Sequence, residues 1–180
     1  MIGGTLSRRY AKAIFELAVE KKSEEEIGQE IERFLTAFVA SPLEKVLNHR
    51  GIGLKNRKAI LVETGKALRL SPVVVSFLCL LLECDRLRFL RFIAERYRRM
   101  LNEMKGRVEA RAISAAPVEE SVLERLRAVL KSISGKEVIL EHGIDPGLIG
   151  GLVVEMEGKV YDGSVRAQLE RMRERMERGY

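Results

Sequence analysis

The hydrophobic pattern changes period near Gly106, and this change constrains the fold more than any other feature of the sequence. Before it, apolar residues recur at the three- and four-residue intervals of amphipathic helices. After it, Val108–Ala112 alternates apolar and charged residues, which is the period of a half-buried strand. The chain is therefore predicted to contain two small domains, residues 1–105 and residues 106–180.

Proline, glycine and serine divide the first region into six predicted helices. Ser23 and Glu26 have the spacing of a capping box, and Ser71 before Pro72 predicts another helix start. The expected helices are Arg8–Val19, a second one carrying Ile27 to Phe38, a short one at Val46–Leu47, Lys55–Leu68, Val73–Cys84 and Leu87–Met104. Six short helices in succession predict an up-and-down bundle.

The second region is predicted to be a small α+β domain, so that the whole chain is mainly α. A strand at Val108–Ala112 is followed by a helix, another strand, a hairpin that turns at Glu157-Gly158, and a last helix capped by Ser164. The expected bounds are Glu119–Ile133 for the first helix, Glu137–Glu141 for the strand, and Leu152–Met156 and Lys159–Asp162 for the hairpin. The apolar stripe of the first helix comprises Leu123, Leu126, Val129, Leu130 and Ile133.

Basic residues are concentrated in the first region. Residues 1–105 carry 20 lysines and arginines against 13 aspartates and glutamates, a net charge of +7. Residues 106–180 carry 12 against 13, a net charge of −1, so that the whole chain has +6. Such an excess fits a solvated basic surface, but also an anionic partner. An arginine-rich segment, Arg86–Arg99, contains Phe89, Phe92 and Tyr97, which could stack on bases or face a helical core. A basic RNA-binding or ribosome-associated protein is therefore an alternative interpretation.

No constellation of catalytic, cofactor-binding or metal-binding residues is found. His49 and His142 are isolated. Cys79 and Cys84 would point about 140° apart on a helix, so they do not form a metal or redox pair. Both lie in an apolar run and are expected to be buried structural thiols in a reducing compartment.

The longest uncharged apolar stretch, Leu70–Leu82, is interrupted by Ser71 and Pro72 and is shorter than the roughly 20 residues of a membrane span. No signal peptide is apparent at the start of the sequence. We therefore expect a soluble protein that reaches a membrane only through partners.

The first helix has an apolar arc of about 240°, wider than a surface helix of a bundle needs. It is either a central helix surrounded by its neighbours, or it packs on one side and receives a partner helix on the other, beside the small Ala13. The apolar helix Val73–Cys84 leaves the same two possibilities open. The last helix has a narrow stripe, Val165, Leu169, Met172 and Met176, that could pack on its own sheet or on another helix.

Four segments resemble one known family. Arg9–Phe15, RYAKAIF, resembles the R-Y-A-K-A-L-F opening of ATP synthase delta subunits, which are related to the mitochondrial oligomycin-sensitivity-conferring protein. Leu80–Leu87, LLLECDRL, is similar to the family's apolar run ending in E-N-x-R-L, with Cys84 in place of the usual asparagine. Ala112–Pro117, AISAAP, resembles the family's A-x-P entry into the next helix. Gly150–Arg171, with its G-G and D-G-S motifs, is similar to the most distinctive family segment.

The resemblance implies a non-catalytic stator subunit of a bacterial F-type ATP synthase, at the cytoplasmic face of the cell membrane and without cofactor or nucleic acid. It implies that the bundle binds N-terminal segments of the alpha subunits, and that the C-terminal domain binds the b subunits of the peripheral stalk. Such a subunit would hold the catalytic head against the torque of the rotor.

For the head, the expected binding residues are Tyr10, Ala13, Ile14, Leu17 and Leu80, as a helix-in-groove site. For the stalk, they are Val165, Leu169 and Met172, together with the hairpin. Asp162, Gly163 and Ser164 are instead expected to shape a strand-to-helix junction, Gly163 through a special backbone angle and Ser164 as a helix cap.

Overall fold

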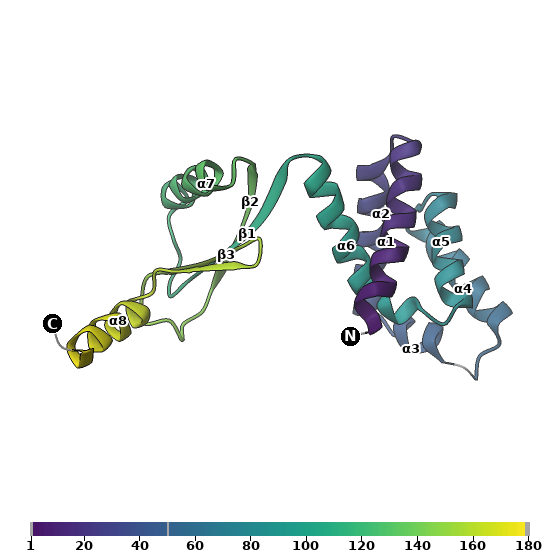
Figure 1. Ribbon diagram of the computed structural model, residues 1–180. Coiled ribbons are helices and arrows are strands. Elements are labelled where there is room, and N and C mark those ends of the chain that lie inside the picture. Colours follow the sequence, from purple (N-terminus) through teal and green to yellow (C-terminus); the bar gives the residue numbers. More distant parts are fainter. Residues whose placement is uncertain (1, 50, 179–180) are drawn as a thin grey trace. The chain divides into compact units, whose positions relative to one another are not determined.

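The computed structural model describes residues 2–49 and 51–178, and the chain divides into two compact units, Met1–Leu101 and Asn102–Tyr180 (Figure 1). It is mainly helical, with a small four-stranded sheet in the second unit. The elements are α1 (Ile2–Glu20), α2 (Glu24–Ala40), α3 (Leu43–Asn48), α4 (Leu54–Ala67), α5 (Pro72–Glu83), a 3-10 turn η1 (Leu87–Phe89), α6 (Leu90–Met104), β1 (Arg107–Ser114), α7 (Glu120–Ser134), β2 (Glu137–Ile144), β3 (Leu152–Met156), β4 (Lys159–Asp162) and α8 (Val165–Arg178).

The helices of the first unit surround one apolar core. Residues from α1 to α6 contribute to it, including the fully buried Phe34, Leu61 and Leu78. The predicted start of α5 is confirmed, because Ser71 caps it with Pro72 at its first turn. Glu30 of α2 adds a polar contact, since its carboxylate accepts hydrogen bonds from the backbone N–H and the hydroxyl of Ser71, at 2.8 and 2.7 Å.

The predicted capping box at the start of α2 is wrong. Ser23 stands at the cap position, but its side chain makes no capping hydrogen bond. Its backbone, at φ −131° and ψ 31°, is not in the β region that aims a cap hydroxyl at the helix. Instead, the Ser23 N–H donates to the Ala18 carbonyl and the Lys22 N–H to that of Val19, with Lys22 left-handed at φ 54°, so that this turn completes the end of α1.

Two glycines let helices of the first unit approach closely. A Cβ on Gly28 of α2 would lie 3.1 Å from the ring of Tyr97 in α6. One on the buried Gly65 of α4 would lie 2.8 Å from a methyl of Val75 in α5. A glycine inside a helix costs about 1 kcal/mol relative to alanine. At both positions it makes room for the neighbouring helix.

The sheet of the second unit has the order β2-β1-β3-β4. Strands β1 and β2 are parallel and are connected through α7, whereas β3 runs antiparallel to both β1 and β4. The predicted hairpin is confirmed, with Glu157 and Gly158 at φ 52° and 77°, as a tight two-residue turn between strands requires. Strands β1 and β2 extend beyond the predicted segments, to Ser114 and Ile144.

Helix α7 packs on one face of this sheet with a narrower stripe than predicted. Leu123 and Leu130 are buried, and Leu130 joins the core cluster of strand residues. Val129 and Ile133 were expected in the same stripe but are 54% and 56% exposed. At about 100° per residue the five apolar positions span about 120°, with Leu123 and Leu130 at one edge of the arc and Val129 and Ile133 at the other. The sheet therefore covers one edge of the stripe and leaves the other exposed.

Candidate partner-binding surfaces

The structure separates the five residues predicted for the head site into core and surface. Ile14 is only 2% exposed and belongs to the core, and Tyr10 is half-buried. Ala13 and Leu17 on α1 are exposed, as is Leu80 on α5, which is 47% exposed. Of the five predicted residues, Ala13, Leu17 and Leu80, with part of Tyr10, therefore remain open to a partner.

Tyr10 connects α1 with the α5 region. Its ring meets the ring of Phe77 edge-on, with centroids 6.5 Å apart. The guanidinium of Arg86 lies 5.6 Å from the centre of the same ring, within the range of a cation–π interaction. A positive charge is thereby held beside the exposed apolar patch, where it can interact with a carboxylate of a partner.

The two cysteines occupy different environments. Cys79 is half-buried, and burial raises the pKa of its thiol, an effect that nearby Lys58 opposes and Glu83 reinforces. It is therefore an unreactive thiol at neutral pH. Cys84 was expected to be buried but is exposed, because it follows the last turn of α5 and points away from the face that packs in the core.

Neither histidine has the surroundings of a catalytic base. His49 Nδ1 accepts a hydrogen bond from the Gly51 N–H at 3.1 Å. His142 Nε2 lies 2.7 Å from the Ser114 hydroxyl, which itself donates to the Ala116 carbonyl. The serine oxygen must then accept a hydrogen bond from the histidine N–H. In a nucleophile and its base the hydroxyl would instead donate to the histidine nitrogen. Within residues 2–49 and 51–178, no group of three or more potential metal ligands comes together.

Helix α8 carries an exposed apolar stripe. Val165 is 36% exposed, Leu169 54%, Met172 55% and Met176 79%. The helix is attached through its first turn, where the Val165 N–H donates to the Gly150 carbonyl and the buried Ser164 hydroxyl accepts from the Ala167 N–H at 3.2 Å. Beyond this turn it extends away from the strands (Figure 1). The stripe is therefore available to another protein.

The junction before α8 is built as predicted in two of three respects. Ser164 caps the helix, and Asp162 Oδ1 accepts the Ser164 N–H at 2.8 Å. This hydrogen bond, with the Ser164 side chain, lowers the pKa of Asp162. The special backbone angle, however, belongs to Gly151 at φ 86° and not to Gly163. A Cβ on Gly151 would lie 2.5 Å from the Gly163 carbonyl oxygen.

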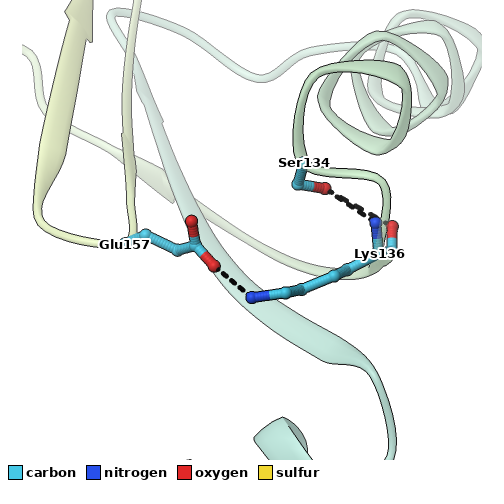
Figure 2. Close-up of polar contacts among 3 residues, drawn as sticks. All are labelled: Ser134, Lys136 and Glu157. Atoms are coloured by element: carbon cyan, nitrogen blue, oxygen red, sulfur yellow. Dashed lines mark hydrogen bonds and ion pairs between the residues drawn. The ribbon is translucent and has the colours of Figure 1, made fainter.

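The hairpin is tied to the turn between α7 and β2 (Figure 2). Lys136 Nζ lies 2.7 Å from a carboxylate oxygen of Glu157 at the hairpin tip. The Ser134 hydroxyl oxygen accepts a hydrogen bond from the Lys136 backbone N–H at 3.2 Å, which fixes the backbone of the lysine. The ion pair lowers the pKa of Glu157 and raises that of Lys136. The hairpin tip is thus held in a defined position.

A cavity of about 880 Å³ lies between α2 and α6 and could not be predicted from the sequence. Small residues, among them Gly28, Ala37 and Ala94, line it together with charged ones such as Glu32 and Arg33. The cavity arises from the packing of two helices, so neither helix alone carries a signal for it.

The aromatic residues of the arginine-rich segment do not form a stacking platform. Tyr97 is buried and donates its hydroxyl to the Glu24 carbonyl at 2.8 Å, and burial raises the pKa of this hydroxyl. Phe89 is partly buried against the core. Phe92, at 54%, remains exposed. A single exposed ring gives little support to binding of single-stranded RNA, which uses several.

Both units thus present apolar helix faces to solvent, and such faces are typical of protein-binding surfaces. None of the helices in the described part of the chain has the length and apolarity needed to cross a membrane.

The chain belongs to the ATP synthase delta (OSCP) subunit family, whose model matches residues 6–176. The ATP synthase delta subunits of Solidesulfovibrio magneticus and Citrifermentans bemidjiense are each 35% identical to it, over 99% of this chain and 100% of theirs. In fold it is similar to a chain of the Toxoplasma gondii mitochondrial ATP synthase hexamer, with a TM-score of 0.75, 20% identity and coverage of 94% of this chain and 96% of that one. It is accordingly a non-catalytic peripheral-stalk subunit of an F-type ATP synthase.

Proposed function

We propose that this subunit connects two specific partners. Residues 1–105, as a six-helix bundle, bind N-terminal segments of the alpha subunits of the catalytic head. Residues 106–180 bind the b subunits of the peripheral stalk. The connection resists the torque that the rotor exerts on the head, at the cytoplasmic face of the bacterial membrane, and no chemical step by this chain is needed.

The observation that carries the head assignment is that Ala13 and Leu17 of α1 and Leu80 of α5 leave an apolar patch exposed to solvent. A small residue such as Ala13 between larger ones allows a partner helix to approach closely. Leu17 and Leu80 would each lose apolar surface to it, at about 25 cal/mol for every Å² buried. Arg86, held by Tyr10, would pair with an acidic residue of the same segment.

The stalk assignment depends on α8 and the hairpin. Val165, Leu169 and Met172 face solvent on one side of a helix that is anchored at one end. The stripe has the spacing of a helix–helix seam, with steps of four and three residues. The long helical ends expected of stalk subunits would supply the complementary stripe.

Calorimetric titration of the full chain with a peptide copying the alpha subunit's N-terminal segment tests the head site. We expect one-to-one binding that Ala13→Asp weakens by several kcal/mol, because the new carboxylate would be buried without a partner. Ala67→Asp, at an exposed alanine of α4, is the matched control and should bind like the wild type. Equal affinity of Ala13→Asp and the control would remove the patch from the proposal.

A further inference from the structure

The charges of α8 are sorted around its apolar stripe. The helix contains five arginines and three glutamates. At about 100° per residue, Arg166 and Arg173 lie on one side of the stripe and Arg175 on the other, roughly 70° to 90° from its centre. The glutamates lie further round, roughly 110° or more from the centre. The charged groups nearest to any helix docked on the stripe are therefore positive, and one of them, Arg173, is also ion-paired within the helix with Glu177 at 3.2 Å.

Helix α7 of the same unit could in principle pack on the α8 stripe, but it also carries a positive charge beside its exposed apolar residues. Helix α7 has its own exposed apolar residues, of which Val122 is 42%, Val129 54% and Ile133 56% exposed. Arg125 lies beside them at about 60° on the helical wheel, while Glu120 and Glu124 lie on the far side. Packing α8 on this face would bring arginines against arginine, which is unfavourable.

A second copy of α8 is disfavoured as the cover on the same grounds. Two α8 helices packed stripe to stripe would bring the flanking arginines of both copies to one seam, with the glutamates of each helix further from it. Charges at these flanking positions determine which helices pair. A helix that complements α8 would therefore carry carboxylates beside its apolar stripe.

We propose that α8 is a charge-selective docking helix, which binds an amphipathic helix whose apolar stripe is flanked by glutamate or aspartate. Val165, Leu169, Met172 and Met176 supply the apolar contact, and Arg166, Arg173 and Arg175 select the partner. The inference rests on the proposed function, because it specifies which chemistry a stalk helix presents at this surface. It extends the predicted stalk site by Met176 and by the three arginines.

The test uses the full chain and two designed helical peptides. Both have leucines at heptad spacing, one flanked by glutamates and the other by lysines. We expect the glutamate peptide to bind at least about tenfold more tightly, with an affinity that falls as salt is raised. Arg166→Glu combined with Arg175→Glu should reverse this preference. These changes lie at opposite ends of α8, so their effects on the helix dipole offset one another.

Lys55→Glu combined with Arg69→Glu, both exposed in the first unit, changes the net charge equally and is the matched control. It should keep the wild-type preference, and circular dichroism verifies that both double variants fold. Equal affinity of the two peptides for the wild type would overturn the proposal. So would a wild-type preference in the α8 variant, or a dimer of the free chain that Leu169→Glu dissociates.

A peptide copying the C-terminal segment of the b subunit, measured in parallel, separates this inference from the proposed function. If it binds but is insensitive to the α8 charge reversal, charge selection is wrong while the stalk assignment stands. If it fails to bind while the glutamate peptide binds with the expected preference, the stalk assignment of α8 is wrong. Failure of every peptide to bind would overturn both.

Discussion

The two units bury their apolar residues to very different degrees. All of the largest fully buried side chains, among them Phe34, Leu61, Leu78 and Tyr97, belong to the first unit. The second unit has a thin core between α7 and one face of the sheet, and its last helix exposes every large apolar side chain of its stripe. The first unit thus encloses a core of its own, whereas the second leaves the apolar stripe of its last helix uncovered.

Helices α1 and α8 show the same difference, because both carry apolar side chains but bury them to different degrees. In α1 the core covers the centre of the wide arc, with Ala11, Ile14 and Ala18 at most 2% exposed, and leaves Ala13, Leu17 and Val19 exposed towards the edges of the arc. In α8, by contrast, every apolar side chain of the stripe stays exposed to solvent. An isolated helix of this length is marginal in water, so α8 is expected to fray unless another helix covers it.

The largest expected effect comes from the core of the first unit. Phe34→Ala removes a ring that is 0% exposed, and should lower the free energy of unfolding of this unit by about 3–5 kcal/mol. Phe92→Ala, at a 54% exposed ring, should change it by less than about 0.5 kcal/mol. Hydrogen exchange of the most protected amides of α2 measures both, and similar losses would mean that the two rings are not buried as described.

The next effect tests the junction that positions α8. Gly151→Ala introduces a Cβ 2.5 Å from a carbonyl oxygen at φ 86°, so it should destabilise the second unit by about 2–3 kcal/mol. Gly158→Ala at φ 77° has no atom within 4 Å of the new Cβ, and should cost about 1 kcal/mol through backbone strain alone. Chemical denaturation compares them. If both variants lost the same amount, the close approach at Gly151 would be of no consequence.

A smaller effect is expected from the cap of α8. Ser164→Ala removes the hydroxyl that accepts the Ala167 N–H and should cost about 1 kcal/mol. Amides in the first turn of α8 should then exchange faster with solvent, whereas those of α7 should not change. Unchanged exchange in α8 would show that the helix is not held through this cap.

The smallest effect is a dependence on pH. The hydrogen bonds from Ser164 lower the pKa of Asp162 below 3.8 in the folded chain. The stabilisation by this carboxylate is therefore fully present above the unfolded pKa and is lost as pH falls through the folded one. We expect the amides in the first turn of α8 to lose protection in acid below about pH 4, and Asp162→Asn to reduce this dependence. An α8 whose protection is equally pH-sensitive in Asp162→Asn would contradict the assignment.

Much of the fold could be predicted from the sequence, because local signals and tertiary packing agree in most elements. Pro72 after Ser71 marks the start of α5, and Glu157-Gly158 marks the hairpin. The parallel pairing of β1 with β2 could not be predicted, since it is set by contacts between residues far apart in the chain. The same holds for the cavity between α2 and α6.

The candidate sites were harder to predict than the fold, because periodicity indicates the direction of a side chain but not which residues cover it. Ile14 and Leu17 have the same apolar character on α1, and only the packed structure shows that one lies in the core and the other at the surface. Val129 was assigned to the core for the same reason and is exposed. The D-G-S motif was correctly placed at a junction, but the strained glycine proved to be Gly151, which lies across the hairpin from it.

Hydrogen exchange of the whole chain, free and within the assembled ATP synthase, tests the central claim most directly. We predict that α8 beyond its capped first turn exchanges rapidly in the free chain and becomes strongly protected on assembly, together with the exposed side of α1 and α5, while the buried amides of α2 are equally protected in both. An α8 that is already protected beyond its first turn in the free chain, or that stays unprotected in the complex, would contradict the account of α8 as a helix completed by its partner.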